Sequence, residues 1–219
     1  MTIYKTIIFD LDGTLTNPEK GITNSLIYAL KQFDKTVTDK KDLYKFIGPP
    51  LSYSFKQFCG FSDTQVQDAI NHYRYYFAKK GWAENQVLPG ATDLLASLKA
   101  QHKQLLLASS KPQPFVLQIL DHFNLTDYFD QIAGATLDDS RSTKAQVISH
   151  VLKKAGINNP EHCVMVGDRE HDIQGAHQNH LPAVGLLLGF GSREELEAAG
   201  ADVIVRDFDE LKALLLVQS

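Results

Sequence analysis

Short runs of apolar residues recur along this chain, each bounded by polar or turn residues. The runs are continuous rather than alternating, which is the pattern of strands that are buried on both faces, as in a parallel sheet. The predicted strands are Thr6–Phe9, Gln104–Ala108, Gln131–Ala133, Cys163–Val166, Ala183–Leu188 and Asp202–Val205.

Between most of these runs, apolar residues recur at the spacing of a helix. The predicted helices are Asp93–Lys99, Pro114–Phe123, Lys144–Ala155, Arg193–Ala199 and Asp209–Leu216. Alternation of strands and helices is typical of an α/β fold with a doubly wound, Rossmann-like parallel sheet. We therefore expect this fold class.

One long segment breaks this alternation. Residues 17–85 contain no clear strand, and their apolar residues, such as Leu26, Leu30 and Ile70, lie at helical spacing. A chain of 219 residues has room for one main core and a second, smaller domain. We predict a core formed by residues 1–16 and 86–219, with a small all-helical domain, 17–85, inserted after the first strand.

Composition argues against several classes of protein. A net charge of −4 does not suit a protein that binds nucleic acid polymers. No apolar run approaches the roughly 20 residues of a membrane-spanning helix, and the N-terminus lacks a signal-peptide pattern. The two cysteines, Cys59 and Cys163, lie far apart, which indicates neither a disulfide framework nor a zinc site. We expect a cytoplasmic protein without a membrane partner.

Polar residues follow three of the predicted strands. Asp10–Thr14 follow the first, Ser109–Lys111 follow the second, and Asp168 follows the fourth, with Asp172 one helical turn beyond. Because ligands of an open parallel sheet bind beyond the carboxyl ends of its strands, these residues should meet on one rim. Carboxylates this close together would repel, and a bound cation would relieve the repulsion. An all-oxygen site suits Mg²⁺, and Mg²⁺ beside a hydroxyl and a lysine suits a phosphoryl group.

The same residues resemble the four motifs of the haloacid-dehalogenase superfamily of phosphatases. Asp10–Thr14 is similar to its DxDGT signature, and Ser109 to its second motif, a hydroxyl residue at a strand end. Lys144 matches the third motif, a lysine at the start of a helix, and Gly167–Asp172 matches the fourth, GDxxxD. All four occur in the family's order.

The inserted helical segment resembles the mobile cap of that family. Three further stretches are similar to phosphoglycolate-phosphatase-like and 5′-nucleotidase-like members. These stretches are Phe46–Leu51, Leu88–Gly90 and Ser109–Pro112.

The resemblance implies a role for each matching residue. Asp10 is the expected nucleophile, which would form an aspartyl phosphate. Asp12 would protonate the leaving oxygen and then deprotonate the attacking water. The expected phosphate-binding residues are Gly13, Thr14, Ser109, Ser110 and Lys144. The expected Mg²⁺ ligands are Asp10, Asp12 through its main-chain carbonyl, and Asp168. Asp172 completes the expected metal site, either as a ligand through water or by orienting Lys144. The candidate substrate contacts are Gly48, Pro49, Arg74 and Lys111.

We therefore expect a Mg²⁺-dependent phosphatase, a monomer or homodimer, acting on a small-molecule phosphate ester. The ester would be phosphoglycolate-like or a nucleoside 5′-monophosphate. One alternative is a phosphomutase of the same fold, similar to β-phosphoglucomutase. Another is a non-catalytic protein that binds phosphate esters, which the intact Asp10 and Asp12 disfavour.

Overall fold

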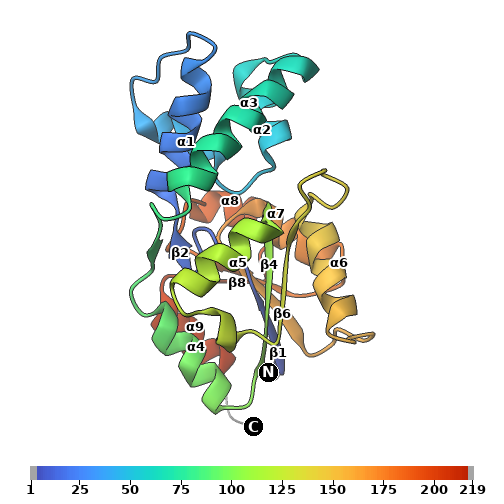
Figure 1. The fold of residues 1–219 in the computed structure, drawn as a ribbon. Coiled ribbons are helices and arrows are strands. Elements are labelled where there is room, and N and C mark those ends of the chain that lie inside the picture. Colours follow the sequence, from blue (N-terminus) through green and yellow to red (C-terminus); the bar gives the residue numbers. More distant parts are fainter. Residues whose placement is uncertain (1–3, 217–219) are drawn as a thin grey trace. The chain divides into compact units, whose positions relative to one another are not determined.

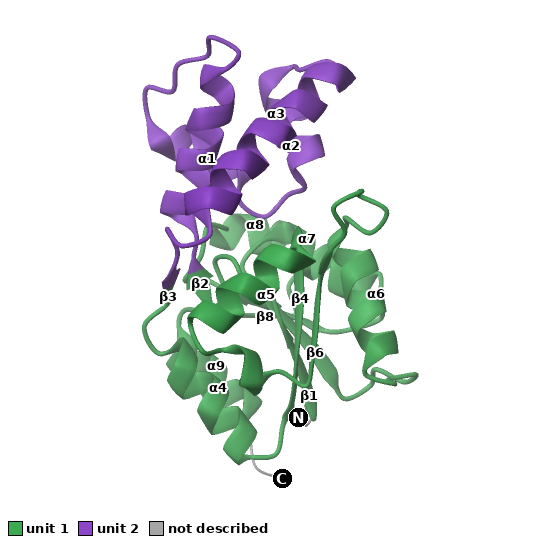
Figure 2. Cartoon of the chain, in the orientation of Figure 1, with its two compact units in different colours: residues 1–16, 87–219 green, residues 17–86 purple. Residues whose placement is uncertain are grey.

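The computed structural model describes residues 4–216. The chain divides into two compact units (Figure 2). Unit 1 contains the residues up to Thr16 and those from Val87 onward, and unit 2 is Asn17–Gln86. Among the described residues, no helix is long and apolar enough to cross a membrane.

Unit 1 is built on a parallel sheet (Figure 1). Within residues 4–216 this sheet has six strands in the order β5-β4-β1-β6-β7-β8. The strands are β1 (Thr6–Phe9), β4 (Gln104–Pro112), β5 (Gln131–Ala135), β6 (Cys163–Gly167), β7 (Ala183–Leu186) and β8 (Val203–Val205). Strand order reverses around β1, which confirms the predicted doubly wound α/β fold.

Strand β1 lies at the centre of the core. Ile8 pairs in register with Leu106 of β4 and Met165 of β6, and all three side chains are fully buried. Burial on both faces explains why the strand sequence is continuously apolar. The carboxyl ends of β1, β4 and β6 therefore meet at one edge of the sheet.

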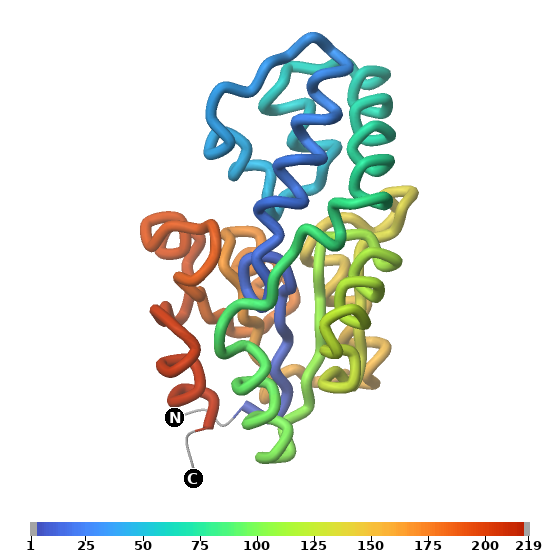
Figure 3. Tube along the Cα trace, turned by 60° about the vertical axis from the view of Figure 1, so that its left-hand side comes forward, coloured from blue at the N-terminus to red at the C-terminus, as the bar shows by residue number. Residues whose placement is uncertain are grey.

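Helices cover both faces of this sheet. Helices α6 (Lys144–Lys154), α7 (Glu170–His177) and α8 (Arg193–Ala198) pack in a row on one face. The other face carries α4 (Ala91–Ala100), α5 (Gln113–His122) and α9 (Phe208–Leu215), with α4 and α9 side by side (Figure 3). A short 3₁₀ turn, η3 (Thr126–Tyr128), follows α5.

The predicted strands β5, β6, β7 and β8 differ from the observed ones by one or two residues at one end, and two elements of unit 1 differ more. Strand β4 continues to Pro112, beyond the predicted end at Ala108, because its last residues are polar and do not extend the apolar run. Helix α7 is not among the predicted helices, because a short stretch with five polar residues among its eight carries little apolar periodicity.

Unit 2 is helical apart from the residues at its ends. It contains α1 (Glu19–Lys31), η1 (Lys40–Phe46), α2 (Leu51–Cys59), α3 (Asp63–Tyr76) and a single π turn, η2 (Phe77–Gly81). Helix α1 packs along α3 and η2. The two-residue strands β2 (Thr16–Asn17) and β3 (Gln86–Val87) pair with each other where the chain enters and leaves this segment. Strands this short leave no periodic signal in a sequence.

Candidate active site

A tight turn follows β1 and places Asp10 and Asp12 at the edge of the sheet. Gly13 adopts a φ of +86°, and its N–H donates to the carbonyl oxygen of Thr16 at 2.7 Å. A Cβ at Gly13 would lie 2.3 Å from Oδ2 of Asp168, so only glycine fits here. Thr14 Oγ1 donates to Oδ1 of Asp168 at 3.2 Å. The turn after β1 is thereby joined to the residue that follows β6.

Lys144 connects the strand ends to helix α7. Its Nζ lies 2.7 Å from Oδ1 of Asp10 and 2.8 Å from Oδ1 of Asp172, and it donates to the carbonyl oxygen of Ala108 at 3.0 Å. Lys144 is the first residue of α6, whose start is held by a capping box between Thr143 and Gln146. The position of this lysine is therefore determined by the helix start as well as by its partners.

Asp168 is held by the loop that follows β7. The backbone N–H of Phe190 donates to Oδ2 of Asp168 at 2.8 Å. On either side of Phe190, a Cβ at Gly189 would lie 2.1 Å from Oδ2 of Asp168, and one at Gly191 would lie 1.9 Å from the carbonyl oxygen of Asp168. Sequence reasoning missed this loop. Two glycines flanking one residue just after a predicted strand were the available signal.

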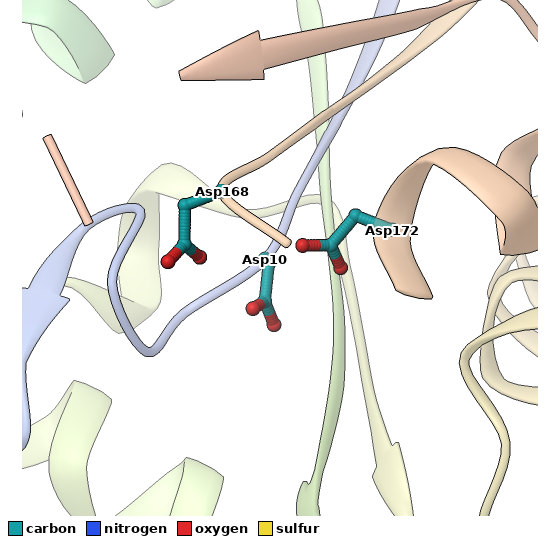
Figure 4. A group of neighbouring side chains, drawn as sticks. All are labelled: Asp10, Asp168 and Asp172. Atoms are coloured by element: carbon teal, nitrogen blue, oxygen red, sulfur yellow. The ribbon is translucent and has the colours of Figure 1, made fainter. Parts of the chain in front are cut away.

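Three carboxylates converge at this edge (Figure 4). Asp10, Asp168 and Asp172 each offer one oxygen atom, and these atoms all lie within 4.8 Å of one another. All three residues are buried. An oxygen-only donor set of this density fits a hard divalent cation such as Mg²⁺.

Burial and mutual repulsion shift the pKa values of this cluster. Burial raises the pKa of Asp10 to about 6, an effect that Lys144 opposes and Asp172 reinforces. Burial, with repulsion from Asp172 and Asp10, raises the pKa of Asp168 well above its ordinary value. Burial alone would lower the pKa of Lys144, but Asp10 and Asp172 outweigh it and raise that pKa. A bound cation would favour the ionised carboxylates, which is a second reason why the site suits a metal.

Asp12 faces a different partner. Its Oδ2 forms an ion pair with Nζ of Lys111, and only 11% of the Asp12 side chain and 6% of the Lys111 side chain are exposed. Its Oδ1 is buried and has no hydrogen-bond partner among the described residues. Ser109 is also buried, and its Oγ accepts from the backbone N–H of Lys111 at 3.3 Å, whereas Ser110 is half-buried.

The structure thus brings most of the predicted site residues to one rim. These are Asp10, Asp12, Gly13, Thr14, Ser109, Ser110, Lys111, Lys144, Asp168 and Asp172. The other three predicted contacts, Gly48, Pro49 and Arg74, belong to unit 2, and their role toward a substrate stays a prediction.

Comparison with known proteins identifies the family. Residues 7–186 match the model of the haloacid dehalogenase-like hydrolases. The chain belongs to this family. The prediction of a haloacid-dehalogenase-type enzyme is therefore confirmed.

Several relatives are similar to this hydrolase over nearly the whole of its chain. A 5′-nucleotidase of Pseudomonas aeruginosa is 41% identical over 97% of this chain and 96% of its own. The tyrosine-protein kinase PtkA of Mycobacterium tuberculosis is 35% identical over 95% of this chain and 72% of its own. A crystal structure of a predicted phosphatase from Clostridium acetobutylicum superimposes with a TM-score of 0.96, at 46% identity, over 98% of this chain and 99% of that one.

Proposed function

We propose that this hydrolase is a Mg²⁺-dependent phosphatase that cleaves a small phosphomonoester through an aspartyl phosphate on Asp10. The observation that carries the proposal is the contact of Asp10 with Lys144, beside two further carboxylates and next to the unpaired Oδ1 of Asp12. The turn after β1 supplies a nucleophile, Asp10, and a proton-transfer group, Asp12, and the start of α6 supplies a cation for phosphate oxygens, Lys144.

In the first half of the reaction, a carboxylate oxygen of Asp10 attacks phosphorus and displaces the alcohol. Asp12 gives its proton to the leaving oxygen as the ester bond breaks. Lys144 and the hydroxyl of Ser109 hold phosphate oxygens. The backbone amides of the turn at Gly13 and Thr14 can approach the phosphate closely because glycine adds no side chain there.

In the second half, water attacks the phosphorus of the aspartyl phosphate. Asp12, now ionised, takes a proton from this water, and the bond between Asp10 and phosphorus breaks. Inorganic phosphate leaves, and Asp10 and Asp12 return to their starting states.

Asp10, Asp168, Asp172 and the main-chain carbonyl of Asp12 would hold the metal ion. When bound, Mg²⁺ offsets the negative charge of the phosphoryl group and of the carboxylates around it. Asp172 also contacts Lys144, so the two functions expected of Asp172, ligating and orienting, are compatible.

Among small phosphomonoesters, nucleoside 5′-monophosphates are the first candidates. The relative named 5′-nucleotidase is 41% identical, whereas those named phosphoglycolate phosphatase are 24% identical. Phosphoglycolate is the second candidate. We propose that unit 2, which carries Gly48, Pro49 and Arg74, acts as the cap that selects between them.

The test is phosphate release from a panel of esters, with Mg²⁺ and with a chelator. The panel contains nucleoside 5′-monophosphates, phosphoglycolate, hexose 1-phosphates and 4-nitrophenyl phosphate. We expect Mg²⁺-dependent release, fastest with a nucleoside monophosphate. Isomerised sugar phosphate without free phosphate would instead identify a mutase. Transfer of phosphate to tyrosine from a nucleotide, with no ester hydrolysis, would also contradict the proposal.

A further inference from the structure

Strand β4 is irregular where it reaches the active-site rim. Its pairing with β5 is regular up to Ala108, opposite Ala133, but the next pair is Pro112 opposite Ala135. The three residues Ser109–Lys111 therefore stand opposite the single residue Gly134. A bulge of this kind bends a strand and redirects its side chains, and bulges are frequent beside active sites.

Gly134 makes this bulge possible. A Cβ there would lie 2.7 Å from the carbonyl oxygen of Lys111 and 2.7 Å from the backbone nitrogen of Gln113. The backbone N–H of Gly134 donates to Oε1 of Gln113, and its carbonyl oxygen accepts from Nε of Arg141 at 3.2 Å. Gly134, the residue opposite the bulge, is thus held through both its N–H and its carbonyl oxygen.

The bulge turns Lys111 toward the turn after β1. Its Nζ reaches Oδ2 of Asp12, and both side chains are almost entirely buried. Burying an ion pair contributes little net stability, because each charge must leave water. The pair is therefore better explained by what it does to Asp12. It holds one carboxylate oxygen and leaves the other, Oδ1, buried and without a hydrogen-bond partner among residues 4–216.

We propose that Lys111 is a positioning residue for proton transfer, which holds Oδ2 of Asp12 so that Oδ1 is the atom that gives and takes the proton. The inference rests on the proposed function. It changes the predicted role of Lys111, from a substrate contact to a partner of Asp12.

The assignment is consistent with both halves of the reaction. In the first, the proton on Oδ1 moves to the ester oxygen as the bond from that oxygen to phosphorus breaks and the bond from Asp10 forms. Oδ2 of the protonated acid is then a carbonyl oxygen, which still accepts from Lys111. In the second, Oδ1 takes a proton from the water that attacks phosphorus, as the bond from Asp10 breaks. Lys111 keeps its own proton throughout.

The test compares Lys111→Met with Lys111→Arg on two esters. 4-Nitrophenyl phosphate has a leaving group that needs little protonation, whereas a nucleoside 5′-monophosphate releases an alkoxide that needs it. For Lys111→Met at saturating substrate we expect kcat on the nucleotide to fall about 10- to 100-fold, part of what a general acid–base contributes. The rate constant for forming the phosphoenzyme from the nitrophenyl ester, measured as rapid nitrophenolate release, should be the same as in the wild type. Hydrolysis of this phosphoenzyme should slow, so a burst should appear.

Lys111→Arg keeps the charge and should recover most of the lost rate. Lys99→Met is the matched control, because Lys99 also pairs with an aspartate, Asp130, but is partly exposed and precedes the opposite end of β4. Lys99→Met should change neither the rapid release of nitrophenolate nor the hydrolysis of the phosphoenzyme.

A double-mutant cycle isolates the coupling to Asp12. In an Asp12→Asn background residue 12 can neither give nor take the proton, so its orientation by Lys111 no longer matters and adding Lys111→Met should cause no further loss of rate. The double variant also leaves no unpaired buried charge, which favours its folding. Three results would overturn the inference, provided that the wild type hydrolyses esters. They are an equal loss in the burst and steady-state rates, a change in KM alone, and additive effects in the cycle. If the wild type released no phosphate, the proposed function itself would fail, and the inference with it.

Discussion

The ammonium nitrogen of Lys144 lies 2.8 Å from Oδ1 of Asp172, and both side chains are almost wholly buried. The same nitrogen lies 2.7 Å from the proposed nucleophile, Asp10. One lysine thus contacts two carboxylates that come from different elements, the end of β1 and the first turn of α7. This relationship makes the stability of unit 1 and the reactivity of Asp10 depend on the same charges.

Lys144→Met should destabilise the protein in a pH-dependent way. Removing one partner of a buried ion pair costs about 3–5 kcal/mol, because the other charge stays buried. We expect such a loss in the free energy of unfolding at pH 7.5, and a smaller loss at pH 5, where Asp10 can bind a proton instead. Urea denaturation in the presence of a chelator measures both values. Lys99→Met, at a partly exposed pair, should cost about 0–1 kcal/mol. Equal losses of Lys144→Met at the two pH values would contradict this account.

Asp10→Asn should abolish turnover and leave the fold intact. The amide is similar in size to the carboxylate but cannot form an acyl phosphate. The expected result is no phosphate release and no phosphoenzyme in acid-quenched samples, with unchanged circular dichroism. Asp130→Asn, the same substitution at a surface ion pair, should keep wild-type activity. A variant of Asp10 that still formed phosphoenzyme would show that another residue is the nucleophile.

Without metal, the protein should lose stability as the pH rises from about 4 to above 6. The folded-state pKa of Asp10 is raised from 3.8 to about 6, so the folded protein binds this proton more tightly than the unfolded chain does. The stabilisation that comes from this proton is complete below the pKa of Asp10 in the unfolded chain. It is lost as the pH rises through the pKa of Asp10 in the folded protein. A rise in the pKa of Asp10 from 3.8 to about 6 corresponds to about 3 kcal/mol in the free energy of unfolding. The pKa of Asp168 is raised too and acts in the same direction.

Mg²⁺ should reverse this loss, because it binds the ionised carboxylates. The rise in melting temperature on adding Mg²⁺ should therefore grow between pH 5 and pH 7.5. Asp168→Asn removes one of the proposed ligands and should reduce that rise. A Mg²⁺ effect that did not change with pH would argue against binding at this cluster.

Gly189→Ala should weaken Mg²⁺ binding. The added methyl would lie 2.1 Å from Oδ2 of Asp168, so either Asp168 or the loop after β7 must move. Loss of outer-shell support typically weakens metal binding about 10- to 100-fold, and we expect the midpoint of a Mg²⁺ titration, followed by melting temperature, to rise by a similar factor. Leu188→Ala, at the exposed preceding residue, serves as the control and should leave the midpoint unchanged.

Gly21→Ala should destabilise unit 2, although alanine usually favours a helix by about 1 kcal/mol over glycine. A Cβ at Gly21 would lie 2.0 Å from the carbonyl oxygen of Gly81, so the contact between α1 and η2 must open. We expect a loss of about 1–3 kcal/mol, the usual cost of overpacking. The single tryptophan, Trp82, lies in unit 2 and reports its unfolding by fluorescence. Lys20→Ala, at the exposed neighbouring position, should be close to neutral.

Much of the fold and of the candidate site could be predicted from local sequence. Strand β1 has the predicted bounds, because a strand buried on both faces must be continuously apolar. The residues after β1, β4 and β6 could be placed on one rim for a topological reason, since parallel strands end at the same edge. Asp10, Asp168 and Lys144 followed from that rule together with the order of the motifs.

The tertiary structure decided the contacts that have no local signature. Lys111 forms its ion pair with Asp12 where β4 bulges opposite Gly134. The backbone N–H of Phe190 donates to Asp168, a partner that the glycines beside Phe190 do not identify in the sequence. Hydrophobic periodicity reports which side of an element is buried. Periodicity does not show which distant residues contact that buried side. Those contacts depend on strand register and on close packing between elements that are far apart in the chain.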